Sequence, residues 1–137
     1  MATVKQQTVK NTRELRLENK ATGTVMTKGN LLAITAGLAV DADNGTVVAD
    51  LLGLCNDTIS VADAETRVEI IKLSDEDTFL IDTANNSNAD HNNQAMVLSD
   101  ATTANNTGTT SATGIVVQVE PFGAASDKQI ICRFVTL

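Results

Sequence analysis

The 137-residue sequence is long enough for one domain with a single hydrophobic core. It has three Phe and no Tyr or Trp, so it lacks the aromatic anchors of many sugar and small-molecule sites, and its net charge of −7 argues against nucleic acid as a partner. The apolar runs are too short to cross a bilayer, and the first residues have no signal-peptide pattern. We therefore expect a soluble protein made in the cytoplasm, with no membrane partner.

Basic residues are concentrated at the start of the chain. Residues 1–20 contain five basic and two acidic side chains, a net charge of +3, whereas residues 21–137 contain five basic and fifteen acidic ones, a net charge of −10. We predict an extended basic N-terminal arm over residues 1–20 and a single β domain over residues 21–137. Because the domain is acidic, the arm is expected to make any contact with an acidic partner.

Within the arm, residues 12–19 alternate in polarity. Leu15 and Leu17 fall on one side of an extended chain, and Glu14, Arg16 and Glu18 fall on the other, which predicts an edge strand with one apolar face. An edge strand has unpaired backbone groups that can add to a partner's sheet. We expect deletion of residues 1–10 to leave the domain folded but to weaken partner binding. The candidate partner-binding residues are Lys5, Lys10, Arg13, Leu15, Arg16, Leu17 and Lys20.

Short apolar segments separated by glycines follow the arm. Residues 31–35, 37–42 and 50–56 are predicted strands. Asn44-Gly45 is typical of a type I′ turn and predicts a hairpin between residues 37–40 and 46–55. Residues 41–45 also resemble a calcium loop, but the glycine comes fifth and Leu52 stands twelfth, where a glutamate is needed. We therefore predict no metal site.

The strongest local pattern is a hairpin over residues 66–83. β-Branched and aromatic residues precede and follow the acidic tetrad 74–77, which is predicted to form the turn. Ile70 and Ile71 are adjacent apolar residues, as are Phe79 and Leu80. This pattern indicates either that both faces of the hairpin are covered or that a bulge shifts its register.

The last third of the chain alternates between polar and apolar stretches. Residues 84–113 are rich in Asn and Thr and predict two long surface loops separated by one strand over residues 94–98. Residues 114–123 and 128–137 predict a closing hairpin. The whole pattern predicts an all-β fold, a small barrel or sandwich of roughly eight to ten short strands.

No arrangement of residues points to catalysis. His91 is the only histidine and is expected to be a solvated loop residue. Asp75, Glu76 and Asp77 are neighbours in a predicted turn, so they cannot face each other across a substrate as glycosidase carboxylates do. Cys55 and Cys132 lie in apolar strands and are predicted to be buried, reduced thiols. We predict neither an enzyme nor a cofactor.

The order of these features is also informative. A basic arm is followed by KGNLLAITAGLAV, an Asn-Gly turn, DLLGLCND, a hairpin, polar loops and a late GIVVQVEP strand. This layout resembles the capsid decoration, or cement, proteins of tailed bacteriophages. The resemblance implies a virion protein, commonly a homotrimer, that binds the outer capsid surface and staples neighbouring major capsid protein subunits. An alternative is a receptor-binding or fibre-like virion module that uses the Asn/Thr-rich loops.

Overall fold

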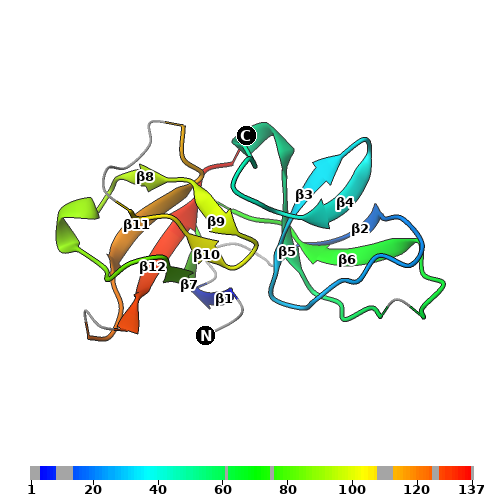
Figure 1. Ribbon diagram of the computed structural model, residues 1–137, viewed down its shortest axis with the longest axis horizontal. Coiled ribbons are helices and arrows are strands. Elements are labelled where there is room, and N and C mark those ends of the chain that lie inside the picture. The colour runs from blue at the N-terminus through cyan, green and yellow to red at the C-terminus, as the bar shows by residue number, and fades with distance from the viewer. Residues whose placement is uncertain are drawn as a thin grey trace.

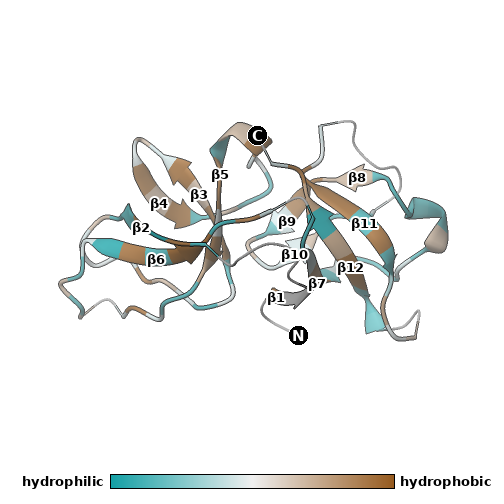
Figure 2. Cartoon of the chain, turned by 180° about the vertical axis from the view of Figure 1, so that it is seen from behind, coloured by the Kyte–Doolittle hydropathy of each residue, from teal (hydrophilic) through white to brown (hydrophobic). Residues whose placement is uncertain are grey.

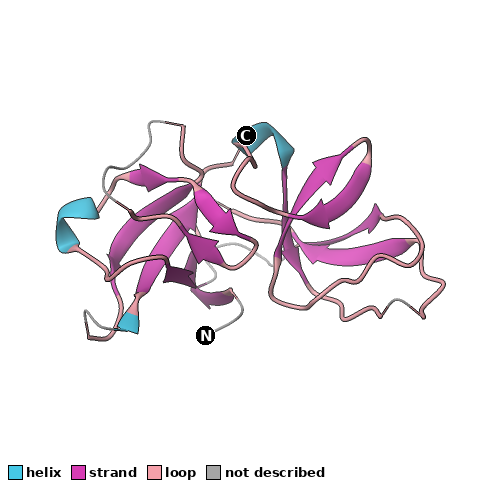
Figure 3. Cartoon of the chain, viewed as in Figure 1, coloured by secondary structure: helices cyan, strands magenta, loops and turns pink. Residues whose placement is uncertain are grey.

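The computed structural model describes residues 4–8, 14–60, 62–74, 76–107, 113–124 and 127–136. It shows an all-β, sandwich-like protein with two sheets that form adjacent lobes (Figures 1 and 3). Helical segments are short 3₁₀ turns such as η1 (Val48–Asp50) and η2 (Ala89–His91). The predicted all-β class is confirmed, with twelve strands in the described ranges. Neither sheet closes into a barrel over these ranges.

The smaller sheet has five antiparallel strands and is strongly curled. Its two edge strands, β2 and β4, contact each other, which shows the extent of the curl. The strands predicted over residues 31–35, 37–42 and 50–56 all lie in this sheet. In spatial order the strands are β2 (Leu15–Asn19), β6 (Arg67–Ile71), β5 (Leu51–Cys55), β3 (Leu31–Thr35) and β4 (Leu38–Asp41).

The larger sheet has seven strands and is organised around β7 (Thr78–Thr83). β7 pairs with β12, and it also pairs with β1 near its start and with β10, in parallel, near its end. The predicted closing hairpin is confirmed as the β11/β12 pair. The remaining strands of this sheet are β1 (Lys5–Thr8), β8 (Ala95–Met96), β9 (Leu98–Asp100), β10 (Thr103–Ala104), β11 (Val116–Pro121) and β12 (Gln129–Phe134).

Three local predictions about strand pairing are wrong. The hairpin predicted between residues 37–40 and 46–55 is absent, because β4 and β5 each pair with β3 and not with one another. β6 and β7, predicted to form a hairpin, belong to different sheets, and the segment between them crosses from one lobe to the other (Figure 1). The single strand predicted over residues 94–98 is divided, because β8 pairs with β11 whereas β9 pairs with β10. An apolar, β-branched run favours a strand but does not choose its partner, and the partners are distant in sequence.

The hydrophobic core explains why apolar residues are adjacent in several strands. Ile71 belongs to the main cluster, which spans both sheets and includes Phe79 and Phe134, with ring centroids 5.1 Å apart. Ile70 belongs to a second cluster inside the curl of the smaller sheet. Both faces of β6 are therefore covered at its Ile70–Ile71 end, in line with one of the two interpretations of its sequence. Figure 2 shows the hydrophobic residues concentrated along β3, β5 and the inner half of β6.

The type I′ turn predicted at Asn44-Gly45 is found elsewhere. Ala36 and Gly37 have φ values of 52° and 79° and connect β3 to β4, with Thr35 opposite Leu38. Positive φ at both central residues is what a type I′ turn requires. In the Asn44-Gly45 segment, the Asp43 carboxylate instead accepts a hydrogen bond from the Gly45 N–H at 2.8 Å. This hydrogen bond from the backbone to the Asp43 side chain stabilises a local turn, which competes with the predicted type I′ turn at Asn44-Gly45.

Both cysteines are buried and free, as predicted. Burial raises the pKa of the Cys132 thiol and of the Cys55 thiol, because the charged thiolate would lose its hydration. The Cys55 Sγ donates a hydrogen bond to the Asp57 carbonyl oxygen at 3.2 Å, which favours the uncharged thiol. The thiols are therefore uncharged core residues over the physiological pH range.

We expect the free energy of unfolding to fall as pH rises above the ordinary thiol pKa of 9.0. Because the folded pKa of Cys132 is raised, its contribution is complete below this pH and is then lost at up to about 1.4 kcal/mol per pH unit. Urea unfolding between pH 7 and pH 10.5 would measure the slope. Cys132→Ala should flatten it, and an equally steep slope in this variant would contradict the assignment.

Candidate partner-binding surface

The structure places the predicted binding residues in different environments. Lys10 and Arg13 lie outside the described residues, and Lys5 is the first residue of β1. Lys20 is 2% exposed, and its Nζ donates hydrogen bonds to the carbonyl oxygens of Ala21 and Thr24 at 3.0 and 3.2 Å. Lys20 therefore holds a turn and is not available to a partner, so its predicted binding role is wrong. Among the members of the predicted set whose burial the structure describes, Leu15, Arg16 and Leu17 are exposed.

The described parts of residues 1–20 are built into both sheets. Val4 is 3% exposed within the main cluster, and its N–H donates to the Gly29 carbonyl oxygen at 2.8 Å. β1 pairs with β7, and β2 pairs with β6. The burial of Val4 shows that residues 1–10 contribute to the core, whereas the expectation that their deletion leaves the domain folded stays a prediction. The division into an arm of residues 1–20 and a domain of residues 21–137 stays a prediction.

β2 is an edge strand, as its alternating sequence predicts. It lies at one end of the five-stranded order. Leu15 and Leu17 are 49% and 51% exposed, and they lie opposite Ile71 and Glu69 of β6. Arg16 points to the other side of the strand. We refer to residues 14–19 as the β2 edge.

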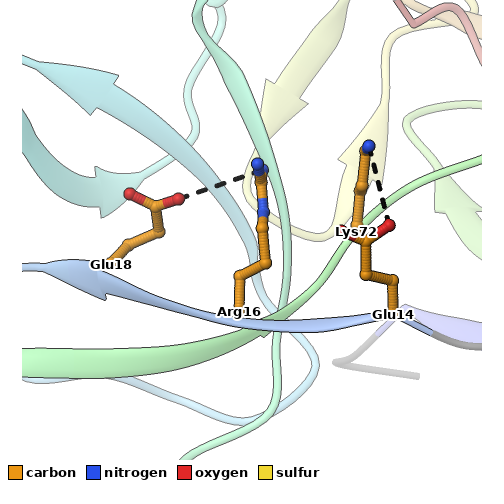
Figure 4. Close-up of polar contacts among 4 residues, drawn as sticks. All are labelled: Glu14, Arg16, Glu18 and Lys72. Carbon is orange, nitrogen blue, oxygen red and sulfur yellow. Dashed lines mark ion pairs between the residues drawn. The ribbon is translucent and has the colours of Figure 1, made fainter.

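The charged side chains of the β2 edge form long ion pairs. Arg16 lies 3.9 Å from Glu18, and Lys72 lies 3.6 Å from Glu14. The side chains of these pairs are between 26% and 56% exposed, so each pair contributes at most about 1 kcal/mol and exchanges readily with other charged groups. Figure 4 shows that the side chains of Glu14, Arg16 and Glu18 project from the same side of β2.

A pocket lies next to these charges. Its volume is about 130 Å³, and it is bounded by β2, η1, β5, the segment after β6 and the segment after β12. Its walls are mainly aliphatic, and Arg16 and Lys72 supply two cationic groups. Sequence reasoning missed this pocket because four segments distant in the chain build it and none of them carries a motif. The lining residues are Arg16, Val48, Ala49, Leu51, Leu52, Lys72, Leu73, Val135 and Thr136.

Buried amides hold the Asn-rich segment after β7 against the larger sheet. The side chain of Asn106 accepts a hydrogen bond from the Asn85 N–H at 2.8 Å and donates to the Asn85 and Asn86 carbonyl oxygens at 3.0 and 3.2 Å. Gln118 of β11 is fully buried and donates to the Asn88 carbonyl oxygen at 2.8 Å. The described part of this segment is therefore an ordered structural element, with the β strands β8, β9 and β10 within it.

His91 is only partly solvated, which corrects the expectation of a solvated loop residue. It ends η2, and its Nδ1 is buried with no hydrogen-bond partner within the described ranges. No group of three or more His, Cys, Asp or Glu side chains in those ranges is placed to hold a metal ion. The described helices include none that is long and apolar enough to cross a bilayer.

Comparison with known proteins does not assign a family. No protein-family model matches the sequence, and no curated protein matches it. The β2 edge and the adjacent pocket are thus the features from which function is inferred.

Proposed function

We propose that this chain is a structural virion protein that binds the outer surface of a tailed-phage capsid and staples neighbouring major capsid protein subunits. The observation that supports this most directly is the pair Leu15 and Leu17, which is half exposed on an edge strand. Exposed apolar edge strands promote unwanted pairing, and soluble proteins usually cover or charge them. A partner that covers the two leucines would explain their presence. The layout of the sequence favours a capsid as that partner.

The fold also supports a stapling role in energetic terms. Residues 15–19 already form a strand paired with β6, so a partner that binds them need not order them from a disordered chain. Ordering each backbone residue costs about 1–2 kcal/mol, so this preorganisation strengthens binding. A homotrimer would present three such edges at once, and multivalent attachment offsets a weak single contact. The proposal involves no catalysis and no cofactor.

Binding of the purified chain to phage heads and to host cells would test this proposal. Heads of the phage that encodes the chain, stripped of the protein, should bind it saturably in a cosedimentation assay, whereas host cells should not. Binding to cells but not to heads would overturn the proposal in favour of a receptor-binding module. Light scattering would test the trimer, which should have three times the chain mass of 14.4 kDa.

A further inference from the structure

The pocket beside the β2 edge has the size of a single side chain. Its volume is about 130 Å³. An engineered apolar cavity of about 150 Å³ binds benzene, so a pocket of this size can hold one leucine or isoleucine side chain. Small-molecule sites usually measure roughly 300–1,000 Å³, so this pocket is too small to enclose a metabolite. It is suited to anchoring one residue of a larger interface.

The lining selects for a particular kind of residue. Val48, Leu51 and Leu73 supply aliphatic surface, which favours an aliphatic side chain. Arg16 and Lys72 supply two cations, although the chain as a whole has a net charge of −7. Glu18 and Glu14 lie near these cations, but the pocket lining itself contains no carboxylate, which favours a ligand that brings one to the cations.

The existing ion pairs leave these cations able to bind a new carboxylate. The contacts of Arg16 with Glu18 and of Lys72 with Glu14 are 3.9 and 3.6 Å long, beyond hydrogen-bond distance. A guanidinium has five N–H donors and an ammonium has three, so an incoming carboxylate can form shorter, charge-assisted hydrogen bonds.

We propose that this pocket anchors an extended segment of the partner protein in which an aliphatic side chain stands beside a carboxylate. This inference rests on the proposed function, because it assumes that the β2 edge binds a protein. The aliphatic side chain enters the pocket, and the carboxylate meets Arg16 and Lys72. The rest of the segment follows β2 toward Leu17.

N-acetyl-leucine is a suitable probe because it combines the isobutyl side chain with a carboxylate. In an NMR titration of the isotope-labelled chain, we expect saturable shifts at the backbone amides of Ala49, Leu51 and Leu73, with a Kd of about 1 mM, as befits a single-residue contact. N-acetyl-leucinamide, which lacks the carboxylate, should bind at least threefold more weakly. Equal affinity for the two probes, or no saturable shift at these amides, would overturn the inference.

Replacement of either of two exposed alanines with tryptophan provides a matched comparison. Ala49 lies in η1 and lines the pocket, whereas Ala89 lies in η2, outside it, and both are exposed. Ala49→Trp should fill the pocket and reduce N-acetyl-leucine binding at least tenfold, while Ala89→Trp should leave it unchanged. The chain has no natural Trp, so the fluorescence of the introduced residue reports whether it is buried. Arg16→Gln combined with Lys72→Gln should abolish the preference for N-acetyl-leucine over its amide.

Head binding separates this inference from the function on which it rests. If the wild-type chain binds heads and Ala49→Trp binds them equally well, the pocket is not the anchor and the inference fails while the proposed function stands. If the wild-type chain does not bind heads, the proposed function fails, and the assignment of a capsid segment to the pocket fails with it. Loss of both probe and head binding in Ala49→Trp, with both retained in Ala89→Trp, would support the inference.

Discussion

Deletion of residues 1–10 is expected to lower the free energy of unfolding by about 3 kcal/mol or more. The deletion removes the buried Val4 side chain from the main core, and burial of a valine is worth about 1.5–3 kcal/mol. It also removes β1 and so exposes part of the edge of β7 at Phe79 and Leu80. In a chain of this size the melting temperature should fall by roughly 10 °C. Thermal unfolding followed by circular dichroism would measure the change.

Two single substitutions separate the core contribution from the loss of β1. Val4→Ala should reproduce part of the loss, because it leaves a cavity next to the main cluster. Val25 is 50% exposed, so Val25→Ala should change stability by less than about 0.5 kcal/mol. A truncated chain with an unchanged melting temperature would show that residues 1–10 form a separate arm after all.

Replacement of Leu15 and Leu17 with aspartate is expected to weaken head binding by about 100-fold or more while the chain stays folded. Both side chains are about half exposed, so the chain should stay folded, with a modest loss of stability because the aspartate at position 17 would lie opposite Glu69. If the pair is buried against a capsid subunit, each leucine acts as an anchor worth about 2 kcal/mol, and each aspartate would place an unpaired charge in the interface. Cosedimentation with stripped heads would measure the affinity.

Salt and a control variant distinguish the apolar contact from the charges around it. The loss caused by the aspartate pair should persist in 0.5 M NaCl. A loss caused by Arg16→Glu should shrink, because the Debye length falls from about 10 Å at 0.1 M salt to about 3 Å at 1 M and exposed charges are then screened over shorter distances. Val25→Asp places a charge at another exposed aliphatic site and should leave binding unchanged. Undiminished head binding by the Leu15→Asp, Leu17→Asp chain would show that the β2 edge is not the attachment surface.

The sequence by itself determined many of the strands, among them β2, β6 and β12, but not β1 and β10, which lie in segments predicted as an arm and a polar loop. The alternation of Leu15 and Leu17 with charged residues predicts the edge strand β2, because successive side chains of a strand point to opposite faces. The adjacent Ile70 and Ile71 indicate either a strand that is covered on both faces or a bulge, and in the structure the two residues enter different clusters. These properties depend on neighbouring residues in the chain, so the sequence alone specifies them.

The tertiary structure alone decided which strands pair and which side chains meet. β6 and β7 are joined by a short segment and were expected to pair, but β6 pairs with β2 and β5, whereas β7 pairs with β12. The sequence predicts that Lys20 binds a partner. The fold instead buries its side chain, which donates hydrogen bonds to two backbone carbonyl oxygens. The pocket depends on Arg16, Lys72 and Val135, which lie far apart in the chain. Such contacts arise from the burial of apolar surface between distant segments, and that burial is non-directional, so local sequence does not encode its partners.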